Sequence, residues 1–227
     1  MLLDRDLTPD LFDIALRIAT SGEPWDQQRK LLTVALRDRV SAQEASGKTK
    51  KCLTRIWINP PRHAKPMICW ATQHLDLSSD RRLFHLGALL ATFPFAASVT
   101  AIIGRAIALE GRVEPLDVRR RAREQWGDKE SVDVAARKVY TTLRAMGALR
   151  GGSRSALEAS ERLAVPAGLT LWLVHALLVG RGSSAIGLRE IEAAPELFWA
   201  SMSTPSDSYP LLQRHSEGLN RTVWSTC

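Results

Sequence analysis

Residues 115–165 contain the feature that most constrains the fold: two amphipathic helical segments in close succession, then two short apolar segments. A helix is expected over residues 115–126, because Pro115 suits a first helical position. Gly127 begins a turn, Ser131 is a favourable N-cap for the second helix, and Gly147 is expected to end it. The second segment has apolar residues three and four apart, which predict one buried face: Val132, Ala136, Val139, Tyr140, Leu143 and Met146.

The residues after Gly147 are typical of a β-hairpin. Residues 148–150 and 156–165 are two predicted short strands, and the Gly-rich turn 151–155 joins them. Helix, turn, helix and hairpin follow one another in this order in a winged helix-turn-helix, whose second helix can enter the major groove of DNA. The sequence therefore predicts a winged helix-turn-helix with a short β-hairpin wing over residues 112–165.

The rest of the chain is expected to be mainly helical. Of its 227 residues 45% are hydrophobic and 24% charged, which is ordinary globular composition. Residues 1–111 show repeated three-to-four spacing of apolar residues and predict an N-terminal helical bundle. Residues 166–227 predict a mixed C-terminal part that packs on the rest. It would contain a buried apolar segment within 163–179, a helix over 188–198 and a Ser/Pro-rich loop over 201–210.

Positive charge is concentrated in two windows. The formal net charge is +7 at pH 7, and the sequence pI is near 9.8. Residues 112–154 contain eleven Lys or Arg against six Asp or Glu, and residues 48–65 contain six basic residues and no acidic one. The remainder of the chain is therefore net acidic. This concentration predicts an anionic partner, and double-stranded DNA fits the predicted fold.

The candidate contacts lie on the side of the second helix that faces away from its apolar positions. An arginine there can bind phosphate or both acceptors of guanine, and a threonine can contact phosphate or a thymine methyl group. Lys48, Lys51 and Arg55 have helical spacing, so they form either a second backbone-contacting helix or a solvated face. The residues predicted to contact DNA are Arg137, Lys138, Thr141, Arg144, Arg150, Arg154, Arg120, Arg123, Lys48, Lys51 and Arg55.

The sequence predicts neither catalysis nor a cofactor or metal. A Gly-Lys-Thr occurs at residues 47–49, but Ala42 occupies the place of the first phosphate-loop glycine. The spacing of the Cys and His residues does not resemble a structural zinc site. Three cysteines without close pairing predict a reducing, cytoplasmic location. The start lacks the pattern of a signal peptide, and the apolar run 163–179 is too short for a membrane span.

An alternative function remains open, because winged helices also serve as protein-docking modules. In that case the chain is a protein-interaction scaffold that docks a larger nuclease, methyltransferase or ATPase.

The layout resembles the BrxA family of BREX phage-exclusion systems. The resemblance rests on residues 15–19 followed by Glu23, Pro24 and Trp25, on the basic stretch 37–55 and on the helix end at 139–149. It is a likeness of arrangement across most of the chain. The resemblance implies a non-enzymatic DNA-binding accessory of a bacterial phage-defence system, with other proteins of a defence complex as further partners.

Overall fold

The computed structural model describes residues 1–37, 39–40, 43–151, 155–205, 209–217 and 221–226. The first half of the described chain is helical, as predicted. Prolines at the first turns of α1, α4 and α6, and Asp80 as the N-cap of α5, account for several of the helix starts. These helices are α1 (Pro9–Ala19), α2 (Trp25–Arg37), α3 (Gln43–Leu53), a π-helical turn (Thr54–Ile58), α4 (Lys65–Gln73), a 3-10 turn (Leu75–Leu77), α5 (Arg81–Thr92) and α6 (Pro94–Glu110).

The second half alternates short strands with helices. Its elements are β1 (Arg112–Val113), α7 (Pro115–Trp126), α8 (Glu130–Ala145), β2 (Leu149–Arg150), β3 (Leu157–Ala159), β4 (Leu163–Ala164), α9 (Ala167–Arg181), β5 (Ala185–Gly187), α10 (Leu188–Glu192), a 3-10 turn (Pro195–Leu197), β6 (Ala200–Ser201), β7 (Leu212–Glu217) and β8 (Arg221–Thr226). The described chain is thus mainly α-helical with small sheets.

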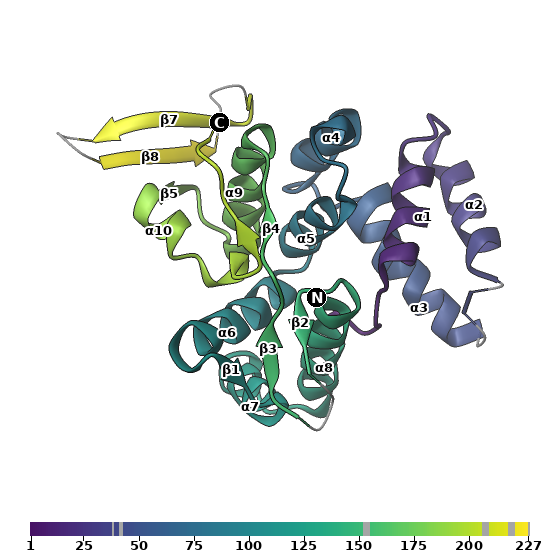
Figure 1. Cartoon of the computed structure of the whole chain (residues 1–227). Coiled ribbons are helices and arrows are strands. Elements are labelled where there is room, and N and C mark those ends of the chain that lie inside the picture. Colours follow the sequence, from purple (N-terminus) through teal and green to yellow (C-terminus); the bar gives the residue numbers. More distant parts are fainter. Residues whose placement is uncertain (38, 41–42, 152–154, 206–208, 218–220, 227) are drawn as a thin grey trace.

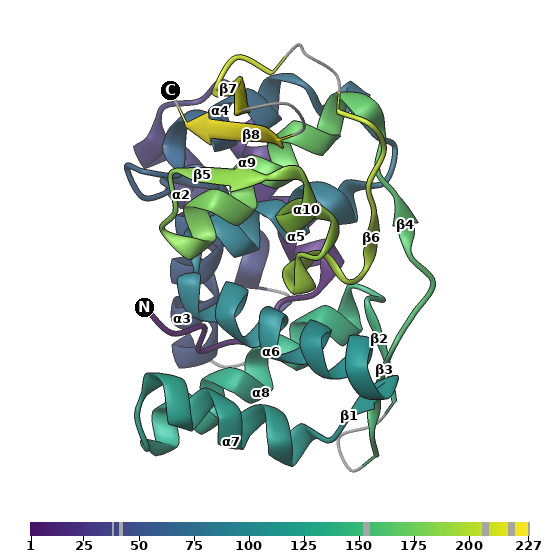
Figure 2. The ribbon, with the colours of Figure 1, turned by 90° about the vertical axis from the view of Figure 1, so that its left-hand side faces the viewer.

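The strands in the described ranges form three small sheets. One is antiparallel with the order β1-β3-β2, one pairs β4 with β6 in parallel, and one is antiparallel with the order β5-β8-β7. Figure 1 shows α1, α2 and α3 on one side of the molecule and the β5-β8-β7 sheet on the other, with α5 and α9 between them. Helices α7 and α8 lie at the lower end, as the rotated view in Figure 2 also shows.

Helices α5 and α9 form the centre of the core. The indole Nε1 of Trp172 on α9 donates to the Met67 carbonyl at 2.8 Å, which satisfies the polar atom of a fully buried ring. Gly87 on α5 leaves room for this ring, because a Cβ there would lie 2.3 Å from it. One continuous cluster of buried apolar side chains extends from Leu3 to Trp224.

Two sequence predictions for residues 156–198 need correction. The helix expected over 188–198 is instead the short α10 and a separate 3-10 turn, because Pro195 lacks the amide that a continuing helix needs. The strand expected over 156–165 is divided: β3 pairs with β1 and β2, whereas β4 leaves this sheet and pairs with β6. The apolar run within 163–179 contains most of the buried helix α9.

No single helix in the described ranges has both the length and the apolar character needed to cross a membrane. Helices α5 and α6 have the required length and apolar character only when they are taken together, and this pair is bent by 115°.

Two buried histidines have side-chain partners. The Nδ1 atom of His175 lies 2.7 Å from the Tyr209 hydroxyl, and the Nε2 atom of His85 lies 2.9 Å from Oδ1 of Asp13. Burial lowers the pKa of His175 to about 4, and burial also lowers the pKa of His85, against the opposing effect of Asp13.

These histidines predict that the fold loses stability in weak acid. Since the folded pKa of His175 is below its unfolded value, the unfolded chain binds the proton first as the pH falls below about 6.5. Between pH 6.5 and pH 5, we expect the lowered pKa of His175 to reduce the free energy of unfolding by at most ~2 kcal/mol. Urea unfolding at both pH values measures it. His175→Asn, which can still bond Tyr209, should flatten the pH dependence, and an unchanged slope would contradict this explanation.

Candidate nucleic-acid interface

Helices α7 and α8 are positioned by their ends and by the small sheet beside them. Glu114 precedes α7 in an extended conformation, Pro115 opens the helix, and Gly127 ends it at φ +99°. The glycine suits this left-handed region, which other residues rarely adopt. The chain order is α6, β1, α7, α8, β2 and β3, and β3 lies between β1 and β2. The hairpin is thereby held beside the end of α8.

The C-terminal end of α8 is fixed by a Schellman motif. The amide of Ala148 donates to the Leu143 carbonyl at 2.9 Å, and the amide of Gly147 donates to the Arg144 carbonyl at 2.9 Å. Gly147 has φ +83°, as the motif requires. This end turns the chain directly into β2, so the sequence prediction of a helix that stops at Gly147 is confirmed.

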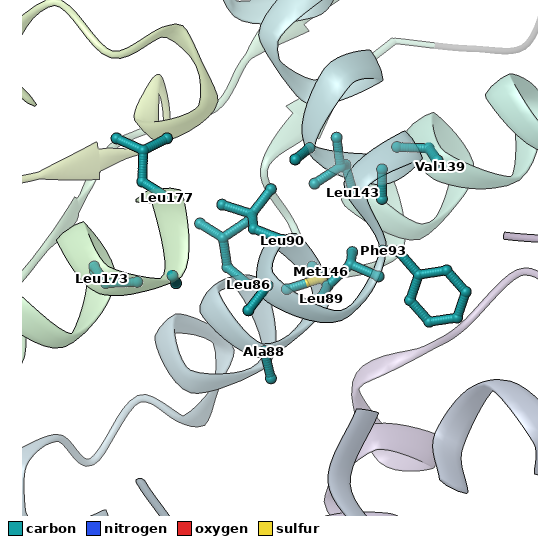
Figure 3. Close-up of a cluster of buried hydrophobic side chains, with 14 of the residues drawn as sticks. Leu86, Ala88, Leu89, Leu90, Phe93, Val139, Leu143, Met146, Leu173 and Leu177 are labelled. Atoms are coloured by element: carbon teal, nitrogen blue, oxygen red, sulfur yellow. The ribbon is translucent and has the colours of Figure 1, made fainter. Parts of the chain in front are cut away.

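The inner face of α8 packs mainly against α6 and α7. Figure 3 shows Val139, Leu143 and Met146 gathered with apolar side chains from α5, such as Leu89, and with Phe93, which joins α5 to α6. All of these side chains are buried. Anchoring on this side leaves the opposite side of α8 turned outward.

The outward strip of α8 carries Arg137, Thr141 and Arg144 at helical spacing. Arg137 is exposed, and Thr141 and Arg144 are half-buried. Burial raises the pKa of the Tyr140 phenol, and the charges of Arg119, Arg137 and Arg144 act in the opposite direction. Within the described residues neither Arg137 nor Arg144 has a carboxylate within ion-pair distance, so both guanidinium groups can accept an external anion.

Lys138 differs from these two arginines. Its Nζ atom lies 2.8 Å from Oδ2 of Asp6, and its side chain is only 17% exposed. Next to this pair, the Leu7 amide donates to Oγ1 of buried Thr142 at 3.0 Å. The N-terminal segment Met1–Leu7 therefore runs along one flank of α8 and partly neutralises it. Lys138, one of the predicted DNA contacts, is therefore already paired with a carboxylate of the same chain.

The same N-terminal segment also reaches α3. The Sγ atom of Cys52 donates to Oδ1 of Asp4 at 3.2 Å, and Leu3 and Leu7 are fully buried. Burial raises the pKa of the Cys52 thiol to about 12. The segment thus joins α3 to α8 and is held there by apolar contacts. The sequence shows Asp4 and Asp6 as two acidic residues close together. It does not show that their partners are Cys52 and Lys138.

The arginines of α7 are largely paired with carboxylates. Arg120 contacts Asp117 at 3.0 Å and Glu124 at 2.8 Å. Arg119 binds Asp133 of α8 at 2.9 Å, and Arg123 lies 3.5 Å from Asp128 and 3.9 Å from Asp133. Arg120 and Arg123 remain on the surface, but their charges are offset locally. These two arginines therefore attract a polyanion less strongly than the charge count of residues 112–154 predicts.

The described part of the hairpin contains one residue that the sequence predicts to contact DNA, Arg150. Arg150 on β2 lies opposite Glu158 on β3, with 3.5 Å between the charged groups, and Arg112 on β1 faces Glu158 from the other side. The Arg150–Glu158 pair is well exposed, so its net interaction is weak and Arg150 can be recruited by another anion. Arg154, the second predicted hairpin contact, lies outside the described residues.

The three predicted contacts near α3 do not share one exposed face. Lys51 is exposed and Lys48 is half-buried. Arg55 lies after α3, in the π-helical turn, where the Asn59 amide donates to the Thr54 carbonyl at 2.7 Å and shifts the helical register. The Nε atom of Arg55 donates to the Thr92 carbonyl at 2.9 Å, and burial lowers the pKa of this guanidinium. Arg55 thus serves the packing of α5, and the expected common face is not formed.

Comparisons of the chain with protein-family models, with curated proteins and with solved structures gave no match. No cluster of three or more potential metal ligands occurs among the residues that the structure describes. The chemistry of this surface is therefore that of Arg137, Thr141, Arg144 and Arg150: two unpaired guanidinium groups, a hydroxyl, and a weakly paired guanidinium on the adjoining hairpin.

Proposed function

We propose that the chain is a non-enzymatic protein that binds double-stranded DNA through α8 and the β2–β3 hairpin. The order α6, β1, α7, α8, β2, β3, with β3 central in its sheet, supports the assignment of these elements as a winged helix-turn-helix. In this proposal the N-terminal helices form a bundle on which the winged helix-turn-helix is mounted. Helix α8 would be the element that enters the groove.

One observation carries the proposal: the anchored helix α8 turns Arg137, Thr141 and Arg144 outward, and its two arginines are not neutralised by described carboxylates. Contacts of this kind are made mainly to phosphates, with limited base readout by Arg137 or Arg144. A small number of phosphate contacts predicts moderate affinity and a measurable dependence on salt.

A titration of random-sequence duplex DNA with the purified chain, monitored by fluorescence anisotropy at two salt concentrations, tests the proposal. We expect saturable binding that weakens as salt rises, with a log–log slope of roughly −3 if three phosphates are contacted. Absence of binding at low salt, or binding that salt does not weaken, would contradict it.

The N-terminal segment predicts a gain of function. Asp6→Asn removes the carboxylate beside Lys138 and frees that ammonium group for phosphate. We expect duplex affinity to rise roughly threefold, since a partly exposed ion pair is worth about 0–1 kcal/mol. Anisotropy titration measures the change. Asp26→Asn removes the same charge from exposed α2 and is the matched control. Equal effects of both substitutions would show that only net charge matters.

Protein docking is the second candidate for the α7–α8 surface. The observation that favours it is the pairing of the α7 arginines with acids, together with Leu116 at 62% exposure on the same helix. In this case the chain would dock a larger nuclease, methyltransferase or ATPase. Stable association with such a protein, without salt-sensitive DNA binding, would favour this candidate.

We further propose that the chain is a cytoplasmic accessory of a bacterial phage-defence system. This part of the proposal is supported by the resemblance in layout to the BrxA family. Deleting the gene from a phage-resistant host that encodes it, followed by plaque counts, tests the role. Resistance should fall, and unchanged plaque counts would contradict the role in defence.

A further inference from the structure

Residues of α1 and α2, together with Arg39, line a groove. These two helices lie on the side of the molecule away from the β5-β8-β7 sheet (Figure 1). The groove is an open hollow with a volume of about 350 Å³. Its lining combines apolar side chains with two arginines: Ile14, Arg17, Ile18, Ala35 and Arg39. The three apolar residues are half-buried, so the groove has an apolar floor that solvent reaches.

The apolar floor continues onto the outer side of α2. This strip follows one side of α2, because Val34 and Ala35 lie three and four residues after Leu31. Leu31 is 37% exposed and Val34 is 59% exposed. An exposed strip of this kind beside a hollow is typical of an interaction site.

Basic residues border this floor on both sides. Arg17 is exposed on α1, and Lys30 and Arg37, seven residues apart, are exposed on one side of α2. Arg39 contacts Asp10 at 3.1 Å, but both side chains of that pair are more than half exposed, so the pair can be exchanged for another carboxylate. The groove therefore combines a hydrophobic floor with cationic rims.

We propose that this groove binds an acidic amphipathic helix of a partner protein. A helix with apolar residues three and four apart would cover Ile14, Ile18, Leu31 and Val34, and its acidic flanks would meet the cationic rims. A second copy of the chain fits less well, because the same face on both copies would bring Arg17, Lys30 and Arg37 close to identical charges. The groove is independent of α8, so the chain could bind this partner and DNA at the same time.

A labelled helical peptide of about 15 residues, with leucines at every third and fourth position and glutamates between them, is a suitable probe. Fluorescence anisotropy would measure its binding to the full chain. We expect saturable binding, and we expect Val34→Glu to weaken it about tenfold, because this change places a carboxylate on the apolar strip. Leu109→Glu, at a side chain that is 82% exposed on α6, is the matched control and should leave binding unchanged.

Five results would overturn the proposal. The peptide could fail to bind, or Val34→Glu could bind it as well as the unchanged chain does. A peptide with lysines in place of glutamates could bind more tightly. The chain could sediment with phosphatidylserine vesicles, and Val34→Glu could abolish this sedimentation; that result would identify a lipid surface as the occupant. A dimer that Val34→Glu converts to a monomer would identify a second copy. Duplex binding by the same variants should stay unchanged, which separates this test from that of the DNA interface.

Discussion

Replacing both Arg137 and Arg144 by alanine should weaken duplex binding roughly 10- to 100-fold, or ~0.7–1.4 kcal/mol for each guanidinium. Both side chains lie on the outward strip of α8 without a described carboxylate partner, so their full charge is available to phosphates. Each lost phosphate contact lowers the log–log salt slope by about 0.9, and the pair should lower it by about 2. Anisotropy titrations at several salt concentrations measure both quantities.

The matched control is the double substitution Arg62→Ala with Lys65→Ala. Both residues are exposed, and α4, which Lys65 begins, lies at the opposite end of the molecule from α7 and α8 (Figures 1 and 2). The control removes the same charge and should change affinity by less than about twofold. If the two double variants behave alike, the outward strip of α8 is not the site of DNA contact.

The second large effect concerns Gly104, in the interior of α6. A Cβ at this position would lie 1.9 Å from the Pro195 carbonyl oxygen, so the backbone of the 3-10 turn would have to move. We expect Gly104→Ala to lower the free energy of unfolding by ~3 kcal/mol, although alanine is the better helix former. In a chain of 227 residues this corresponds to a fall in Tm of roughly 6–12 °C. Urea and thermal unfolding measure the change.

Gly47→Ala is the control for this prediction. Gly47 lies in helix α3, it is exposed, and a Cβ there would meet nothing within 4 Å. The helix propensity of alanine should therefore raise stability by up to ~1 kcal/mol. A Gly104→Ala chain as stable as the unchanged one would show that α6 and the turn at Pro195 do not approach as closely as described.

Local periodicity predicted the buried face and the end of α8, but its start was misplaced, because the N-cap is Lys129 and not Ser131. Its apolar positions, its end at Gly147 and the outward position of Arg137 all follow from residues within one helix. The pairing of Lys138 with Asp6 does not, because the partners are 132 residues apart and nothing local links them. Arg55 was misplaced for a different reason, since the π-helical turn after α3 shifts the register that an ideal helix would keep.

The C-terminal sheet was missed because its strands lack the alternation that signals a strand. Val223 and Trp224 are adjacent in β8 and both are buried, although adjacent strand residues point to opposite faces of the sheet. Strand β5 has three residues, too few to show a period, and it pairs with β8 across about forty residues of sequence. Pairing at this range depends on tertiary packing, which the local pattern does not contain.

Thiol footprinting on α8 tests the DNA interface most directly. Ala145→Cys places a thiol on the exposed strip, one turn beyond Thr141. Cys69 and Cys227 are replaced by Ser in the same chain, and buried Cys52 stays unreactive. Val34→Cys on α2 is the control site. We expect saturating duplex DNA to slow maleimide labelling at position 145 at least about fivefold and to leave position 34 unchanged. Equal labelling rates at position 145 with and without bound DNA would contradict the account.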